Sequence, residues 1–285
     1  MEETTYYQIL ERKIKKTNSL LCFGIDPIIE KIPKKINGSK KQIITEFYSS
    51  ILDNCQKNKI SALKPNYAFF AQYGFEGIMA LREIIDKYKE DYLIILDAKR
   101  GDIGKTSQAY VKEVFEFFGA DATTIWPFMG FDSVLPFIEY ANEKKKGVYF
   151  LARTTNPGAE DFLTLKTENG KALFEEVATK VSEWSKEYNE CLGLVMGATS
   201  PLDLELILKP LYSRKEKLAF LIPGIGAQGG DPLKIIEIIK KYQMEKITLV
   251  NASSSIAYAY LKKDLDYIEA ALEEIKELAN ILKLD

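Results

Sequence analysis

The sequence predicts an α/β protein, a (β/α)8 TIM barrel that occupies residues 1–285 as a single domain. Three observations support this fold. Short apolar runs recur along the chain, amphipathic stretches with helical spacing separate them, and no Pro/Gly/Ser-rich linker divides the chain. Strands with almost no polar residues are typical of a parallel sheet that is covered on both faces.

Eight apolar runs are expected to form the strands. They are residues 19–25, 60–66, 92–98, 121–126, 147–153, 191–197, 217–223 and 246–252. Eight strand–helix units in roughly 250 residues match the barrel. A doubly wound sheet is the alternative, but it usually carries a GxGxxG motif after its first strand, and "FGIDPII" lacks that motif.

Helices are expected around these strands, with the clearest spacing at residues 42–56, 75–90, 107–119, 171–188 and 267–284. The widest gap between strands, residues 154–190, is expected to hold an extended loop before its helix.

Composition excludes several classes of function. The net charge of −2 indicates no general attraction to nucleic acid or to an anionic membrane. The chain has no histidine, which excludes Ser-His-Asp triads, Cys-His pairs and imidazole metal ligands. An enzyme with this composition must use Lys, Asp, Glu, Tyr or Cys as its acid and base.

Cysteine usage and hydropathy indicate the compartment. The three cysteines form no CxxC pair, so we expect a reducing environment without disulfides or structural zinc. The first residues lack the apolar core of a signal peptide, and no segment approaches the length of a membrane span. We therefore expect a cytoplasmic protein.

Catalytic residues of such barrels lie at the C-terminal ends of the strands. The strand ends here carry Asp26, Lys64, Asp97, Lys99, Pro127, Thr154, Thr155, Gly197, Pro223, Gly224, Asn251 and Ser253.

The third strand ends in the charged segment "LIILDAKRGDIGKT", residues 93–106. A solvated loop with internal salt bridges would usually explain such a run. However, alternation along a strand places Asp97 and Lys99 on the same side. The neighbouring strand ends at Lys64, which Pro65 biases toward extended backbone.

An ammonium group between carboxylates stays cationic, because two unit charges about 4 Å apart interact by roughly 4 kcal/mol at an effective dielectric near 20. Lys99, flanked by Asp97 and Asp102, is therefore a candidate proton donor to a carbanion and a poor Schiff-base nucleophile.

The segment "LDAKRGDIGKT" carries Asp-x-Lys-x-x-Asp followed by Ile-x-x-Thr, and it resembles the longer bacterial (type 2) subfamily of orotidine 5'-phosphate decarboxylase. The resemblance extends through "FGIDP", "LKPNYAFF", "ARTTNPGA" and "LIPGIGAQGGD", and so covers nearly the whole chain. It implies cofactor-free and metal-free decarboxylation of orotidine 5'-monophosphate to UMP in de novo pyrimidine biosynthesis.

The resemblance also implies catalytic roles. Lys99 would protonate C6 of the pyrimidine, Asp97 would lie near the departing carboxylate, and Lys64 would bridge Asp97 and the ribose. Asp102, Ile103 and Thr106 would serve the site of a neighbouring subunit, which predicts a homodimer with shared active sites.

Further positions are implied to bind substrate: Asp26 and Asn66 near the ribose, Thr155 at the pyrimidine ring, and Pro223, Gly226, Gln228 and Ser254 at the phosphate. A turn residue before Pro27 is the alternative interpretation of Asp26. Independently of the resemblance, the glycines of "PGIGAQGGD" allow backbone N–H groups to point at a phosphate, as is common after strand seven of such barrels.

The chain departs from the family at Ser254, which aligns with a phosphate-binding arginine. Loss of a charge-assisted contact typically costs roughly 1.5–3 kcal/mol, about one to two decades of affinity. Serines and backbone amides could bind the phosphate instead, a cation from elsewhere could substitute, or the residue was changed in this copy.

Two other functions are consistent with the motifs. A sugar-acid phosphate decarboxylase or aldolase of the same superfamily would require Mg²⁺. A nucleotide-binding relative without turnover would follow if the change at Ser254 had abolished catalysis.

Overall fold

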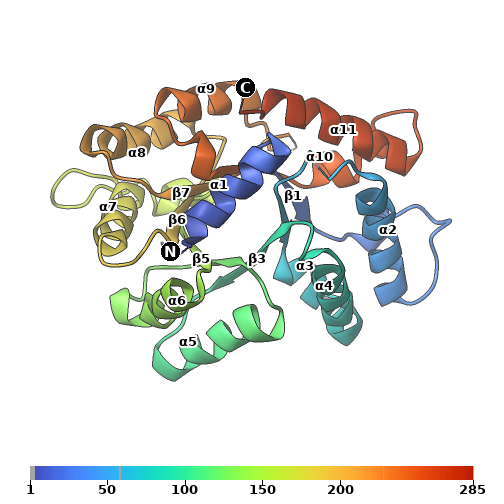
Figure 1. Ribbon diagram of the computed structural model, residues 1–285, viewed down its shortest axis with the longest axis horizontal. Coiled ribbons are helices and arrows are strands. Elements are labelled where there is room, and N and C mark those ends of the chain that lie inside the picture. Colours follow the sequence, from blue (N-terminus) through green and yellow to red (C-terminus); the bar gives the residue numbers. More distant parts are fainter. Residues whose placement is uncertain (1–3, 58, 227, 285) are drawn as a thin grey trace.

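The computed structural model describes residues 4–57, 59–226 and 228–284. Within them, eight parallel strands pair in chain order, and β8 (Thr248–Ala252) pairs with β1 (Leu21–Ile25) to close the ring. Helices surround this ring (Figure 1). The predicted barrel is thus confirmed, and the doubly wound alternative, which is an open sheet, is wrong.

Each predicted apolar run corresponds to one strand, and β3 extends two residues beyond its predicted end at residue 98. The other strands are β2 (Ala62–Pro65), β3 (Leu93–Arg100), β4 (Ala122–Ile125), β5 (Gly147–Arg153), β6 (Leu192–Met196) and β7 (Ala219–Pro223). Apart from Pro223 and the last three residues of β3, every strand residue is buried. This burial explains why the strands appear in the sequence as continuous apolar runs and not as alternating ones.

The five predicted helices are all present. The α-helices are α1 (Tyr6–Thr17), α2 (Lys40–Asn54), α3 (Tyr67–Ala71), α4 (Gly74–Tyr88), α5 (Gly104–Val111), α6 (Phe131–Lys144), α7 (Leu173–Ser185), α8 (Pro201–Arg214), α9 (Pro232–Lys241), α10 (Ser254–Ala257) and α11 (Tyr267–Ile281). Shorter 3-10 helices are η1 (Ile29–Lys31), η3 (Pro157–Asp161), η4 (Glu245–Ile247) and η5 (Ala259–Leu261), and α5 continues into a π-helix, η2 (Lys112–Phe117). The predicted long loop after β5 precedes α7.

Helix α1 closes the end of the barrel at which the strands begin, and Figure 1 shows it crossing the ring. The hydroxyl of Tyr7 donates to the carbonyl of Leu192, and the amide of Ala219 donates to the same hydroxyl over 3.1 Å. The ring of Tyr6 lies against Gly147, where an added Cβ would come within 2.5 Å of the ring carbons. With this end filled, the open end of the barrel is the one at which the strands terminate.

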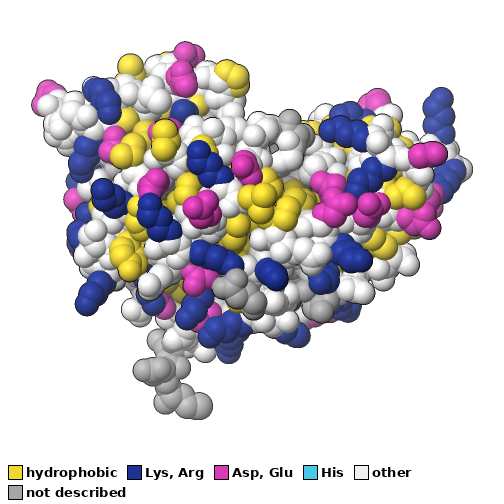
Figure 2. All heavy atoms as spheres, turned by 90° about the horizontal axis from the view of Figure 1, so that it is seen from above, with side chains coloured by type: hydrophobic (Ala, Val, Ile, Leu, Met, Phe, Trp, Pro, Cys, Tyr) yellow, Lys and Arg dark blue, Asp and Glu magenta, His cyan; other side chains and the backbone are white. Residues whose placement is uncertain are grey.

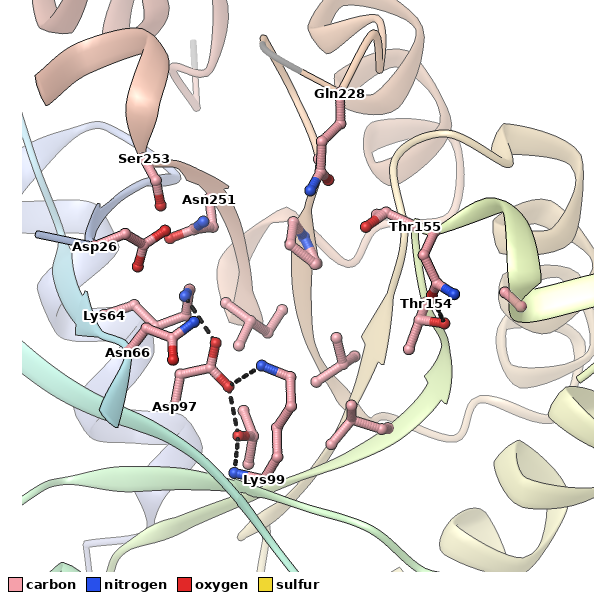
Figure 3. A pocket seen from close by; sticks show the side chains of 18 of the residues that line it. Asp26, Lys64, Asn66, Asp97, Lys99, Thr154, Thr155, Gln228, Asn251 and Ser253 are labelled. Atoms are coloured by element: carbon pink, nitrogen blue, oxygen red, sulfur yellow. Dashed lines mark hydrogen bonds and ion pairs between the residues drawn. The ribbon is translucent and has the colours of Figure 1, made fainter. Parts of the chain in front are cut away.

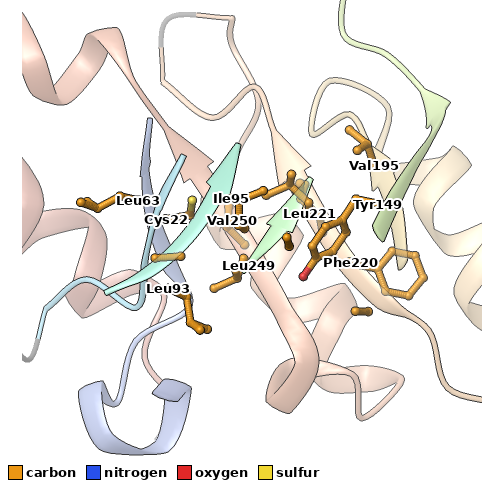
Figure 4. Packing of buried hydrophobic residues seen from close by; sticks show 14 of the residues in the cluster. Cys22, Leu63, Leu93, Ile95, Tyr149, Val195, Phe220, Leu221, Leu249 and Val250 are labelled. Carbon is orange, nitrogen blue, oxygen red and sulfur yellow. The ribbon is translucent and has the colours of Figure 1, made fainter. Parts of the chain in front are cut away.

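The interior is filled by side chains from many strands, as Figure 4 shows. Among the labelled residues, Cys22, Leu63, Ile95, Leu249 and Val250 are fully buried. This packing makes the barrel a solid core and not a pore, which fixes the positions of the strand ends.

Acidic and basic side chains are interspersed on the face shown in Figure 2, with small hydrophobic areas between them. In the part of the chain that is described, no helix has both the length and the apolar character needed to cross a bilayer.

Candidate active site

A cavity of about 890 Å³ opens at the C-terminal ends of the strands. Nine of the thirteen predicted site residues line it: Asp26, Lys64, Asn66, Asp97, Lys99, Thr155, Pro223, Gln228 and Ser254. Figure 3 shows carboxylate, amide and ammonium groups on one side of this cavity, opposite Thr155 and Gln228. The closed barrel therefore brings together residues that lie more than 200 positions apart in the chain.

Asp97 is the centre of a charge network at the ends of β2 and β3 (Figure 3). Its Oδ2 atom lies 3.0 Å from Nζ of Lys64, and its Oδ1 atom lies 2.7 Å from Nζ of Lys99. Thr124 donates a third hydrogen bond to Oδ1 over 2.8 Å. One carboxylate thus accepts hydrogen bonds from two ammonium groups and a hydroxyl.

Burial disfavours the charged forms of Asp97 and Lys64, but their mutual attraction outweighs it. The ammonium groups of Lys64 and Lys99 hold the pKa of Asp97 well below its usual range. Asp97, with a further contribution from Asp26, raises the pKa of Lys64 above its usual value although the side chain is buried. The buried pair therefore stays charged throughout the neutral pH range.

The backbone at Lys99 is irregular. Its φ is +46°, a left-handed value uncommon for a residue with a side chain, and the pairing of β3 with β4 shifts register between Leu96 and Arg100. The amide of Lys99 donates to the hydroxyl of Thr124 over 3.1 Å, which anchors this turn. Alternation correctly predicted that Lys99 and Asp97 share a side, but not the backbone irregularity at that point.

Arg100, the next charge in the segment, points to a different set of partners. It makes two hydrogen bonds to Glu113, of 2.9 and 2.8 Å, and its guanidinium lies 4.3 Å from the ring centroid of Tyr67 and 4.6 Å from that of Tyr110. The charged residues at the end of β3 therefore fall into two groups. Asp97 and Lys99 line the cavity, whereas Arg100 pairs with Glu113 and does not line it.

A second polar group lies beside Lys64, where β1 and β8 end. Oδ1 of Asp26 and Oδ1 of Asn251 are buried and have no hydrogen-bond partner among the described residues. A Cβ at Gly24 would lie 1.8 Å from Oγ of Ser253 and 3.0 Å from Oδ1 of Asn251, so glycine is needed for this approach. Buried acceptors without partners are rare, and these two are suited to bind hydroxyl groups of a ligand.

Gln228 and Thr155 form the opposite side (Figure 3). Gly224 has a φ of +104°, and a Cβ there would lie 2.7 Å from Thr155 and 3.0 Å from Gln228. Glycine at this position thus permits the loop after β7 to approach the loop after β5. Gly226, with a φ of +85°, belongs to the same loop but does not line the cavity.

Three predicted residues lie beyond the cavity. Asp102, Ile103 and Thr106 follow β3, and Ile103 is 55% exposed. The carboxylate of Asp102 accepts a hydrogen bond from the amide of Ile103 over 2.8 Å and makes no ion pair with Lys99 within this chain.

Sequence reasoning missed several cavity residues. Thr124 carried a weak signal as a polar residue near the end of a buried strand. The loop after β5 contributes Phe162 and Leu163, although its sequence gave no sign of such a role. Lys31, on η1, also lines the cavity and is a lysine in an exposed segment without any motif.

Comparisons with known proteins agree with this arrangement. A family model described as "Orotidine 5'-phosphate decarboxylase / HUMPS family" matches residues 19–265. An orotidine 5'-phosphate decarboxylase of Flavobacterium johnsoniae is 38% identical over 286 residues, which cover 96% of this chain and 97% of that protein. One of Herpetosiphon aurantiacus is 38% identical over 242 residues, 85% of each chain.

Solved structures show the same similarity. Leishmania donovani OMP decarboxylase superposes with a TM-score of 0.77 at 31% identity, covering 98% of this chain and 99% of that chain. Leishmania donovani UMP synthase gives a TM-score of 0.79 at 32% identity over 98% of this chain, which spans 57% of that longer chain.

Proposed function

The chain belongs to the orotidine 5'-phosphate decarboxylase / HUMPS family, and we propose that it converts orotidine 5'-monophosphate to UMP and carbon dioxide in de novo pyrimidine biosynthesis. The observation that carries this proposal is the network of Lys64, Asp97 and Lys99 at the strand ends, within a cavity large enough for a nucleotide. The whole chain acts as one catalytic barrel.

In the proposed reaction, the bond between C6 and the carboxylate carbon breaks, and its electron pair stays on C6. A proton from Nζ of Lys99 then forms the new C6–H bond, and solvent later restores the lysine proton. An ammonium group placed beforehand at the developing negative charge stabilises the transition state, because no solvent reorganisation is needed. The fixed charges of the protein perform this chemistry without a cofactor.

Asp97 supports this role in two ways. Its hydrogen bond to Lys99 holds the ammonium group in place, and its own charge is retained because Lys64 lies on its other side. We assign Asp97 to the region of the departing carboxylate, and Lys64 to the contact between Asp97 and the ribose.

The remaining cavity residues bind the substrate. Asp26 and Asn66 are assigned to the ribose hydroxyls. This assignment agrees with the buried Oδ1 atom of Asp26, which has no hydrogen-bond partner among the described residues. Thr155 is assigned to the pyrimidine ring. The phosphate is assigned to the end of the cavity formed by the loops after β7 and β8, which carry Pro223, Gly226, Gln228 and Ser254.

A homodimer with shared active sites is part of the proposal. Ile103 and Thr106 follow Asp102 in the chain and are exposed, although none of the three lines the cavity of their own chain. A second subunit that packs against this segment would receive Asp102 into its own site.

A cytoplasmic location is supported by the cysteines. Cys22, Cys55 and Cys191 are buried and unpaired, and burial raises the pKa of each thiol, to about 12, 11 and 12 respectively. Buried neutral thiols without disulfides are typical of proteins in a reducing compartment.

The test is a spectrophotometric assay of orotidine 5'-monophosphate loss by the purified protein, with and without excess EDTA. We expect equal rates of UMP formation in both conditions. Loss of the activity in EDTA would indicate the Mg²⁺-dependent class of reaction, and tight UMP binding without release of carbon dioxide would indicate a non-catalytic relative.

A further inference from the structure

The phosphate end of the proposed site lacks an obvious cation. The turn after β8 carries Ser253 and Ser254, both neutral, where a nucleotide phosphate would bring about two negative charges. The lysine and arginine residues that line the cavity in the described part of the chain are Lys31, Lys64 and Lys99. Two of these are paired with Asp97, which leaves Lys31 as the available cation.

We propose that Lys31 supplies the positive charge that binds the 5'-phosphate, in place of the missing arginine. This inference rests on the proposed function, since it assumes a nucleotide substrate in the cavity. It adds a substrate-binding residue from the loop after β1, the strand that pairs with β8.

Three hydrogen bonds fix the segment of Lys31 to the turn after β8. The amide of Ile28 donates to the hydroxyl of Tyr258 over 2.7 Å, and that hydroxyl donates to the carbonyl of Asp26 over 3.1 Å. The hydroxyl of Tyr260 donates to the carbonyl of Lys31. The backbone of η1 is therefore held at the cavity, so that only the lysine side chain must move to reach a ligand.

The ammonium group of Lys31 lies over the ring of Tyr258, the residue that follows the short helix α10. Its Nζ atom lies 5.5 Å from the centroid of the Tyr258 ring. The amide of Tyr258 in turn donates to the carbonyl of Ser254 over 3.1 Å. One aromatic residue therefore contacts the cation of the β1 loop and caps the short helix that begins at Ser254.

Among the described residues, Lys31 has no competing anionic partner. No carboxylate of the described residues lies within ion-pair distance of its Nζ atom, whereas Lys35 on the same loop pairs with Asp266 at 2.5 Å. A cation–π contact at an exposed site is weak compared with a charge-assisted hydrogen bond to phosphate. A bound phosphate would therefore attract the ammonium group away from the ring without breaking an ion pair.

The experiment compares Lys31→Gln, Lys31→Arg and, as a matched control, Lys34→Gln, an exposed lysine of the same loop that does not line the cavity. One readout is kcat/KM for orotidine 5'-monophosphate. The second is the ratio of the dissociation constants of uridine and UMP, measured by calorimetry, which isolates the phosphate contribution and needs no turnover.

For Lys31→Gln we expect kcat/KM to fall about tenfold to hundredfold, mainly through KM, and the preference for UMP over uridine to fall by the same factor. Lys31→Arg should retain most of both quantities, and Lys34→Gln should match the wild type. An unchanged UMP preference in Lys31→Gln overturns the inference while the decarboxylase function stands. If the wild type shows no turnover, the proposed function fails, and the UMP preference still decides the role of Lys31.

Discussion

Nζ of Lys99 lies 2.7 Å from Oδ1 of Asp97, and the two side chains differ sharply in exposure, at 43% and 8%. The carboxylate is buried against a second lysine, while the ammonium group faces the cavity. This arrangement separates two tasks, because the buried carboxylate holds the charge in place and the exposed lysine can reach a ligand.

Replacement of Lys99 by alanine should reduce kcat by at least about 10³-fold, since it removes both the proton donor and the fixed positive charge. Lys99 is partly exposed, so the fold should be retained. Steady-state assays and circular dichroism on the same preparation check both statements. Lys276→Ala, an exposed lysine on α11, is the control. Appreciable residual turnover in Lys99→Ala would remove this residue from its proposed role.

Replacement of Asp97 by asparagine should lower the free energy of unfolding by about 3 kcal/mol at neutral pH, because it leaves the buried ammonium group of Lys64 without its closest anion. Urea unfolding at equal protein concentration measures the effect. Asp264→Asn, at an exposed position, should cause little change. A stability loss no larger than that of the control would show that the pair contributes nothing.

The free energy of unfolding of the wild type should fall at acid pH as Asp97 becomes protonated. The pKa of Asp97 is depressed in the folded state, so its contribution is fully present above the unfolded pKa near 3.9 and is lost as pH falls toward the folded value. Unfolding free energies measured from pH 5 down to pH 2 should therefore decline more steeply for the wild type than for Asp97→Asn. Parallel curves would contradict the depressed pKa.

Ser254→Arg should lower KM for orotidine 5'-monophosphate by about tenfold and leave kcat nearly unchanged, because a guanidinium adds a charge-assisted contact to the phosphate. The same substitution in the Lys31→Gln background should recover much of the lost affinity. An unchanged KM in both backgrounds would place the phosphate elsewhere in the cavity.

Subunit complementation tests whether Asp102 serves the partner. Lys99→Ala and Asp102→Ala should each be inactive alone. In a mixed dimer, one of the two sites would contain an intact Lys99 from one chain and an intact Asp102 from the other. With equal expression, half of the dimers are mixed and one of the two sites in each mixed dimer is complete. The activity averaged over all sites should thus return to about one quarter of the wild-type value. No recovery, although mixed dimers are isolated by two affinity tags, would assign Asp102 to its own chain.

The strands were predictable because burial on both faces leaves a continuous apolar run. For example, the run at 147–153 coincides with β5. The strand ends then indicated where polar side chains gather, and Lys64 and Asp97 were found in this way. Lys31 and Thr124 were missed for opposite reasons. Lys31 lies in an exposed loop with many lysines, and Thr124 looks like any β-branched residue of a buried strand.

The sequence by itself determined the order of strands and helices, the closed barrel, and the charged cluster at the end of β3, because each depends on short-range patterns of polarity. Only the tertiary structure decided which charges share the cavity. Lys99 and Arg100 are neighbours in the chain, yet Lys99 contacts Asp97 and Arg100 contacts Glu113. The guanidinium of Arg100 also lies 4.3 Å from the ring centroid of a tyrosine. The physical reason is that a positive φ at Lys99 and a register shift in β3 redirect these side chains. Such a local distortion is stabilised by contacts with distant residues, and no sequence pattern encodes those contacts.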